Sequence, residues 1–211
     1  MPIRKTISNQ AELQNYFKNS SIFLVKNSKI TFYDDLILES NICFEGKIFL
    51  GKRNKVSNNC KIKDSKIGSN NNIQENTIIT DSVIFNYNNI GPFSFIRANS
   101  KVGNSNRIGT FVEIARSEIK NYVQISHMSF LGDILLGSKV IIGAGVITAN
   151  FYKNKRNKTT IGQNTLIGCN TVLIAPIIIG SQVIVAAGSN INFNIGNKKK
   201  VIQKKETSII N

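Results

Sequence analysis

Cysteine and histidine are scarce in this sequence, with three cysteines and one histidine among 211 residues. Cys43, Cys60 and Cys169 lie far apart and form no Cys-x-x-Cys pair. This pattern argues against a disulfide framework and a structural zinc site, and it favours a reducing cytoplasm. One histidine per chain also disfavours a three-histidine zinc site of the carbonic-anhydrase kind, so we expect no metal requirement.

Long hydrophobic runs are absent as well. Residues 1–10 are largely polar and lack the apolar stretch of a signal peptide. The longest apolar stretch, Val172–Ile179, is too short to span a membrane and contains Pro176. We therefore expect a cytoplasmic protein without a membrane partner.

Acidic residues are also few, because 12 Asp and Glu stand against 27 Lys and Arg and leave a formal net charge of +15. This excess permits a nucleic-acid or phosphate partner. The chain is at the same time rich in Asn, Lys and Ile, a composition that an A+T-rich genome produces without selection on charge. We therefore expect no nucleic-acid partner. A hydrophobic fraction of 41% and a charged fraction of 18% indicate a packed core and exclude a disordered chain.

What the sequence has in abundance is a six-residue repeat of aliphatic positions. The series, which includes two five-residue steps, runs through Ile90, Ile96, Val102, Ile108, Ile114, Ile119, Ile125, Leu131, Leu136, Ile142 and Thr148, and resumes at Ile161, Ile167, Leu173, Ile179, Val185 and Ile191. A looser series upstream contains Leu36, Ile42, Ile48, Leu50, Val56, Ile62, Ile67 and Ile73. Glycine follows many of these positions, and asparagine is frequent between them.

A period of six fits neither an α-helix nor an uninterrupted alternating strand, but it does fit a short strand followed by a turn. Three such units close one triangular coil of about 18 residues, with the aliphatic side chains stacked inside. Gly and Asn tolerate the backbone conformations that the turns need. The sequence therefore predicts an all-β protein, a parallel β-helix. A β-sandwich is the alternative, but its strands would not hold a six-residue register over so long a stretch.

Segments without the repeat define the expected domain organisation. Asn9 and Glu12 have the spacing of a capping box, so a short helix is predicted to cap the first coil. Residues 149–160 separate two regular repeats and are predicted to protrude as a loop. The expected parts are an N-terminal capping segment at 1–29, the β-helix at 30–195 and a basic tail at 196–211.

Several strings then resemble one family. In order they are IGPFSFIRANSKVG, IGTFVEIARSEI, VQISHMSFLGD, VIIGAGVITANF, KTTIGQNTLIGCNTVLIAPIIIG and VAAGS. They are similar to the acetyltransferase half of the bacterial bifunctional enzyme that makes UDP-N-acetylglucosamine, a hexapeptide-repeat acyltransferase. The resemblance covers about residues 31–189. It implies a left-handed β-helix, a homotrimer with sites between subunits, and acetyl-CoA as co-substrate. The segment before the coils is too short for the family's uridylyltransferase domain, so nucleotidyl transfer is not expected.

The resemblance assigns roles to two catalytic candidates. Acetylation of an amine requires a base that takes the amine proton, and an unperturbed imidazole is mostly neutral at pH 7. His127 lies in the string that matches the family's catalytic one, so it is predicted to be the base. Glu113 in FVEI is predicted, by resemblance, to orient this imidazole from a neighbouring coil. The alternatives are a surface histidine and an ordinary exposed carboxylate.

Three residues are candidates for the acceptor, an amino-sugar phosphate, most simply glucosamine-1-phosphate. Arg97 matches the family's phosphate-contacting arginine, and a guanidinium binds a phosphate bidentately. Asn150 matches a polar residue at the base of the protruding loop. Arg156 falls where the family has a lysine that reaches the substrate, and Lys153, Lys155 and Lys158 lie beside it. A loop made basic only for solubility is the alternative.

Four residues match positions around the coenzyme. Ala144 and Ala187 correspond to small residues that leave room for the pantetheine arm, and Cys169 replaces a small polar residue of that groove. Lys204 in the tail roughly matches a basic residue near the coenzyme phosphates. Routine turn and core packing is the alternative for all four.

The sequence departs from the family at three acceptor positions. Ala115, Phe130 and Ile141 stand where the family has Lys, Tyr and Asn. Arg116 is expected on the opposite face of the strand from Ala115, because neighbouring residues of a strand alternate. The departures keep two other interpretations open: the same chemistry on another amino sugar or nucleotide-linked amino sugar, and a non-catalytic trimeric scaffold.

Overall fold

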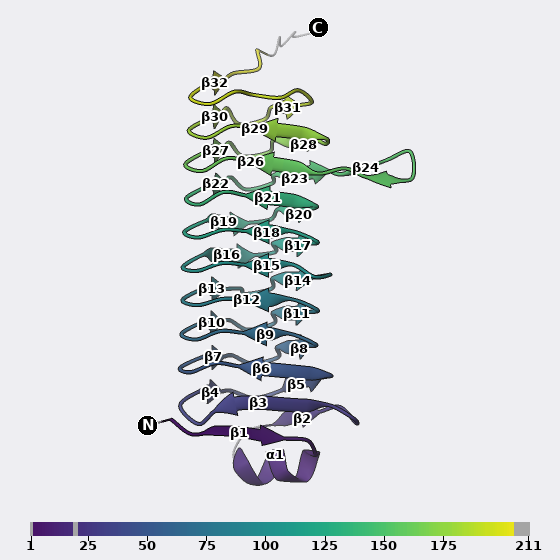
Figure 1. Ribbon diagram of the computed structural model, residues 1–211, viewed down its shortest axis with the longest axis vertical. Coiled ribbons are helices and arrows are strands. Elements are labelled where there is room, and N and C mark those ends of the chain that lie inside the picture. The colour runs from purple at the N-terminus through teal and green to yellow at the C-terminus, as the bar shows by residue number, and fades with distance from the viewer. Residues whose placement is uncertain (1, 19–20, 205–211) are drawn as a thin grey trace, which may run out of the picture.

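The chain forms a column of triangular coils with three long faces, each of them a sheet (Figure 1). The computed structural model describes residues 2–18 and 21–204. The chain rises one coil at a time in the left-handed sense, from the N-terminal end of the column to the C-terminal end (Figure 1). The predicted fold class, an all-β left-handed parallel β-helix, is confirmed.

Each face is a ten-stranded sheet, and successive strands of a face come from successive coils. Sheet A contains, in order, β1 (Arg4–Ile7), β3 (Lys29–Tyr33), β6 (Lys47–Leu50), β9 (Lys66–Ile67), β12 (Val83–Ile84), β15 (Lys101–Val102), β18 (Glu118–Ile119), β21 (Ile134–Leu136), β26 (Thr159–Ile161) and β29 (Ile177–Ile179). Sheet B contains β2 (Ile22–Leu24), β5 (Ile42–Glu45), β8 (Lys61–Lys63), β11 (Ile78–Thr80), β14 (Phe95–Arg97), β17 (Glu113–Ala115), β20 (Phe130–Gly132), β23 (Ile147–Ala149), β28 (Val172–Ile174) and β31 (Asn190–Ile191). Sheet C contains β4 (Ile37–Leu38), β7 (Lys55–Val56), β10 (Asn72–Ile73), β13 (Asn89–Ile90), β16 (Arg107–Thr110), β19 (Gln124–His127), β22 (Ile141–Ile142), β27 (Leu166–Ile167), β30 (Ile184–Val185) and β32 (Lys200–Val201).

The repeat positions form the core of the column. The main aliphatic series from Ile90 to Ile191 is buried throughout, and so is the upstream series except Leu36. Leu36 is only partly buried because it precedes β4, whose buried residue is Leu38. Within a strand the flanking residues point outward, since side chains alternate between the two faces of a strand. Each strand of a coil therefore offers one inward residue of the repeat series and outward side chains that are free for function.

The corners explain why asparagine is so frequent. Many corner residues have positive φ, and Asn supplies several of them, for example Asn70 (59°) and Asn76 (57°). A second set of asparagines lies inside the corner between sheets A and C as a buried ladder of four side chains: Asn54, Asn71, Asn88 and Asn106. Each rung accepts a hydrogen bond from the next rung through its Oδ1, as Asn71 does from the Asn88 backbone N–H (2.9 Å) and Nδ2 (3.0 Å). The ladder satisfies polar groups that would otherwise be buried without partners.

The N-terminal segment covers the first coil. Helix α1 (Gln10–Tyr16) begins where predicted, with the Asn9 side chain accepting a hydrogen bond from the Glu12 backbone N–H at 2.8 Å. Strand β1 pairs with β3 in the antiparallel direction, unlike the parallel pairs of the coils. Helix and strand thus close the open end of the β-helix.

The interruption after β23 protrudes from the column, as predicted (Figure 1). It is a hairpin of β24 (Phe151–Tyr152) and β25 (Lys155–Arg156), joined by Lys153 and Asn154, both with positive φ. At the C-terminal end β32 pairs with β30, so sheet C continues into the segment expected to be a tail. Residues 205–211 of that segment lie outside the described residues.

Candidate active site

His127 is the last residue of β19, at the corner where sheet C turns into sheet B. Its side chain is exposed, and within the described ranges its imidazole has no hydrogen-bond or ion-pair partner. Its Cα pairs with that of Thr110 in the coil below. The one histidine of the chain is therefore available to an incoming ligand.

Three of the four coenzyme candidates lie in a column above His127. Strand pairing sets Ile125 against Ile142, and this register, carried on by two residues, places His127 level with Ala144. The next pairings place Cys169 and then Ala187 in the same line. The two coils approach closely here, because a Cβ added to Gly143 would lie 2.5 Å from the backbone nitrogen of Cys169. Coils are spaced by about 4.8 Å, so this corner column is about 14 Å long. Its side chains are small, which leaves the backbone of the corner accessible.

The upper end of the corner column carries positive charge. Lys204 follows β32, one coil beyond Ala187, and its side chain is exposed.

Cys169 is exposed, whereas Cys60 is buried elsewhere and burial raises the pKa of its thiol to about 11. Cys169 is therefore the accessible thiol of the two.

Arg97 and Glu113 meet on the outer face of sheet B. The Arg97 Nε donates to Glu113 Oε1 at 2.8 Å, and Nη2 lies 2.7 Å from the same oxygen. Both side chains are about one-third exposed. The structure thus engages Glu113 with Arg97, and it gives Glu113 no bond to His127. The orienting role of Glu113 remains a prediction, while the ion pair fixes the guanidinium predicted to contact phosphate.

Arg116, Asp133 and Asn150 form a second cluster at the corner between sheets B and A. Arg116 donates through Nε and Nη2 to the two carboxylate oxygens of Asp133, at 2.9 and 3.0 Å. The Asn150 amide donates to the same carboxylate. The expectation that Arg116 faces away from Ala115 is wrong, because β17 ends at Ala115 and Arg116 lies in the corner with a φ of 54°. Strand alternation does not apply there, and the side chain points outward.

The three departures from the family have different surroundings. Ala115 is fully buried and pairs with Arg97 below and Gly132 above. The Phe130 ring lies over Gly132, where a Cβ would meet both that ring (2.8 Å) and the Asn150 amide (2.5 Å). Ile141 is on a different face, sheet C, and is 42% exposed. Only the first two therefore border the Arg97 side of the site.

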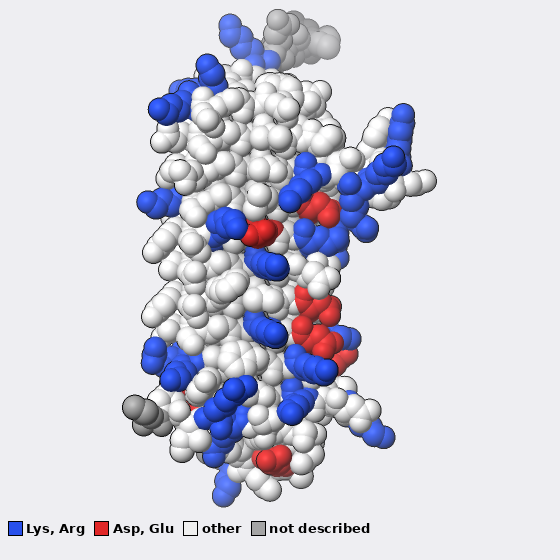
Figure 2. All heavy atoms as spheres, viewed as in Figure 1, with Lys and Arg blue, Asp and Glu red and all other residues white. Residues whose placement is uncertain are grey.

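The hairpin brings charge to the same side of the column. Its base is held where the Asn157 N–H donates to the Asn150 carbonyl at 2.7 Å. Arg156 on β25 is exposed, and among the described residues it has no ion-pair partner. Figure 2 shows Lys and Arg side chains gathered on this projection. Asn150 thus links the hairpin to the Asp133 cluster.

An exposed apolar stack lies below His127 on the corner between sheets C and B. The Phe93 and Phe111 rings stack with centroids 5.3 Å apart, and Met128 lies one coil above. All three have positive φ, which is unfavourable for bulky side chains. Their exposed fractions are 48%, 61% and 62%.

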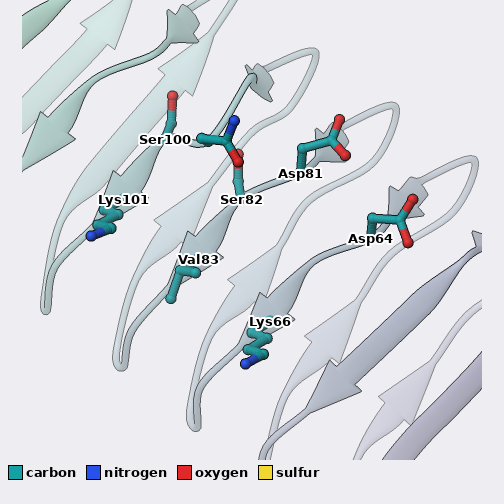
Figure 3. A pocket seen from close by; sticks show the side chains of 8 residues that line it. Asp64, Lys66, Asp81, Ser82, Val83, Ser100 and Lys101 are labelled. Carbon is teal, nitrogen blue, oxygen red and sulfur yellow. The ribbon is translucent and has the colours of Figure 1, made fainter.

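The surface also has a groove in coils that precede the candidate site. A groove of about 240 Å³ lined by Asp64, Lys66, Asp81 and Lys101 lies along the corner between sheets B and A, in earlier coils (Figure 3). Within residues 2–18 and 21–204, no three His, Cys, Asp or Glu side chains are grouped to hold a metal ion. None of the described helices is long and apolar enough to cross a membrane.

Asp133 is the residue of the site that the sequence reasoning missed. A usable signal was present, since Arg116, Asp133 and Asn150 are separated by 17 residues each, which is one coil in this part of the column. Opposite charges and an amide at that spacing stack on one corner and bind one another.

Comparison with known proteins identifies the same six-residue repeat that the coils show. The family model for the bacterial transferase hexapeptide (six repeats) matches residues 158–192. The Bifunctional protein GlmU of Wigglesworthia glossinidia brevipalpis is 35% identical over 95% of this chain and 42% of its own length. The GlmU protein of Ruthia magnifica is 40% identical over 76% of this chain and 36% of its own length. The chain thus spans less than half of these relatives.

Among solved structures, the UDP-N-acetylglucosamine O-acyltransferase LpxA of Moraxella catarrhalis superposes with a TM-score of 0.66 and 15% identity. The match covers 79% of this chain and 69% of LpxA, and identity this low supports a common fold alone. The identity to GlmU extends over nearly the whole chain and the repeat model matches its C-terminal coils. The chain therefore belongs to the hexapeptide-repeat family and is homologous to GlmU.

Proposed function

We propose that this protein is an acetyl-CoA-dependent N-acetyltransferase of the cytoplasm that acts on an amino-sugar phosphate, most simply glucosamine-1-phosphate. The observation that supports it is the corner column: an unpartnered His127 at the foot of a line of small residues that ends near Lys204. An extended pantetheine arm fits such a line, since Ala144, Cys169 and Ala187 leave the backbone accessible. The Lys204 ammonium then lies near the coenzyme phosphates, and the thioester lies near the imidazole.

Acetyl-CoA supplies an activated acetyl group whose C–S bond breaks as the new C–N bond forms. The acceptor amine attacks in its neutral form, and the role of His127 is to take the proton that the nitrogen loses as the C–N bond forms. The same imidazole then returns this proton to the departing thiolate. A side chain without a competing partner can move between these two positions.

The acceptor's phosphate is proposed to lie on sheet B against Arg97. Glu113 holds this guanidinium through Nε and Nη2, so Nη1 remains for a ligand. Asn150 and Arg156 border the same side, one at the base of the hairpin and one on β25. A phosphate there gains charge-assisted hydrogen bonds, which are stronger than neutral ones.

The exposed stack of Phe93, Phe111 and Met128 supports assembly into a homotrimer. Bulky residues with positive φ cost stability in an isolated chain, and a partner that buries them offsets this cost. We expect Phe111→Asp to convert an oligomer into monomers in light scattering, because a carboxylate would be buried without a partner. Phe23→Asp, at an exposed position in the first coils, serves as the matched control. A monomeric unsubstituted protein contradicts this part of the proposal.

A thiol-release assay with acetyl-CoA tests the function. The acceptors are glucosamine-1-phosphate, glucosamine, and a nucleotide-linked amino sugar. We expect release to be fastest with glucosamine-1-phosphate and clearly slower with glucosamine, since loss of one charged hydrogen-bonding group costs about 1.5–3 kcal/mol. Fastest release with the nucleotide-linked sugar would replace the acceptor but keep the chemistry.

A non-catalytic trimeric scaffold is the second candidate. Ala115 favours it, because a fully buried alanine lies where a lysine would contact a sugar phosphate in the family. No thiol release with any acceptor, together with no detectable binding of acetyl-CoA, would decide for the scaffold.

A further inference from the structure

A groove of about 390 Å³ crosses the corner between sheets A and C, at the opposite edge of sheet C from His127. Tyr87 and Tyr122 form its walls, and Arg107 and Gln124 lie on its sheet C side. Gln124 begins the strand that His127 ends, so about 10 Å of β19 separates the groove from the candidate active site. The groove is therefore a separate feature of the surface.

The two tyrosines occupy positions where bulky side chains are unfavourable. Their φ values are 60° and 59°, whereas other coils place Asn70 and Asn164 at the same corner. Between the tyrosines, one coil from each, lies Ser105. Tyr87 and Tyr122 are 62% and 59% exposed, so burial in this chain does not explain the choice of residue.

The spacing of the tyrosines leaves room for a ring. Two coil steps separate their backbones by about 9.6 Å, and the small Ser105 leaves the space between them open. With the two rings spaced as their backbones are, a planar ring placed midway would lie about 4.8 Å from each, within the 4.5–7 Å that aromatic pairs prefer between centroids.

Asn89, Arg107 and Gln124 carry donor groups that bond no described residue, whereas Asn106, which also lines the groove, belongs to the asparagine ladder. Asn89, Arg107 and Gln124 are neighbours on three successive strands of sheet C. Asn89 Oδ1 already accepts from Asn72 and Gln74, but its Nδ2 has no acceptor among the described residues. Over the same ranges Arg107 has no carboxylate partner, and no Asp or Glu lines the groove. An anionic ligand that also carries hydrogen-bond acceptors along one edge would bond these donor groups.

We propose that this groove binds a nucleoside monophosphate. The base lies between Tyr87 and Tyr122, the phosphate is held by the Arg107 guanidinium, and Asn89 and Gln124 bond the edge of the base or the sugar. A sugar phosphate would use Arg107 but not the two tyrosine side chains that line the groove. A simple inorganic anion would use Arg107 and the amide donors but not the tyrosine side chains.

The test is calorimetric titration of the full-length chain with uridine monophosphate and adenosine monophosphate, each beside ribose phosphate and the free nucleoside. We expect saturable binding of at least one nucleotide, and binding weaker by about tenfold or more in Tyr87→Ala and in Tyr122→Ala, since stacking on one aromatic contributes at that level. Arg107→Gln should weaken the nucleotide by a similar factor and leave the free nucleoside unchanged. Tyr152→Ala, at an exposed tyrosine of the hairpin, is the matched control and should bind as the unsubstituted chain does.

Binding of ribose phosphate as tight as the nucleotides would overturn the proposal, because it would reveal only attraction of anions to a basic protein. Nucleotide binding in the two tyrosine variants as tight as in the unsubstituted chain, or no binding in the unsubstituted chain, would overturn it as well. The titration needs no turnover, so its outcome is independent of the acetyltransferase proposal.

Discussion

Substitution of His127 by alanine is expected to lower the rate of acetyl transfer by about 10²–10⁴-fold, the contribution typical of a positioned acid–base group. The imidazole is exposed, the corner residues in the coils above it are small, and it bonds no other described residue. The loss should fall on kcat, with little change in the affinity for acetyl-CoA, because the coenzyme is proposed to contact the coils above. Thiol release measured under saturating acetyl-CoA checks this.

The control for His127→Ala is Lys101→Ala, an exposed residue of sheet A that is remote from the proposed site. It should retain full activity. Light scattering should give the same assembly for both variants, since an exposed side chain contributes little to the fold. Added imidazole should restore part of the activity of His127→Ala by entering the vacated space. Turnover equal to that of the unsubstituted protein would remove His127 from the mechanism and leave the column as a coenzyme site alone.

The coiled core could be predicted from the sequence because one rule is repeated in each coil. An inward aliphatic at every sixth position is the pattern of burial itself, and the residues from Ile90 to Ile191 follow it. Leu36 departs from this rule because it precedes β4, and the buried residue of that strand is Leu38.

The contacts within the site could not be predicted in the same way. Spacing places Arg97 and Glu113 on adjoining coils, but which carboxylate bonds which cation depends on side-chain reach and corner geometry. Arg116 shows the difficulty, because a one-residue error in where β17 ends reverses the direction of its side chain. Ala144, Cys169 and Ala187 were predicted to share a coenzyme site only from the family resemblance. Strand pairing in the structure aligns all three with His127.

The buried asparagine ladder leads to the largest expected effect on stability. Asn88 accepts from the Asn106 backbone N–H (2.9 Å) and Nδ2 (3.1 Å) and donates to Asn71 Oδ1 (3.0 Å) and the Gly103 carbonyl (2.8 Å). Asn88→Ala removes all four bonds, and it leaves the buried Asn106 groups and the partly buried Gly103 carbonyl without these partners. Each such group costs about 1–3 kcal/mol, so we expect a loss of about 3 kcal/mol after partial relaxation.

Hydrogen exchange is the appropriate measurement, because a repeat protein need not unfold in one step. Removal of its acceptor should speed exchange of the Asn106 amide by about 100-fold, the factor that about 3 kcal/mol corresponds to. Asn86→Ala is the matched control: it lies in the same coil and bonds Asn104, but water reaches its half-buried side chain and can replace the lost partner. Similar exchange in the two variants would mean that the ladder sets the register of the corner without adding to its stability. A large effect confined to Asn88→Ala would instead mean that the ladder stabilises the coils immediately below the candidate active site.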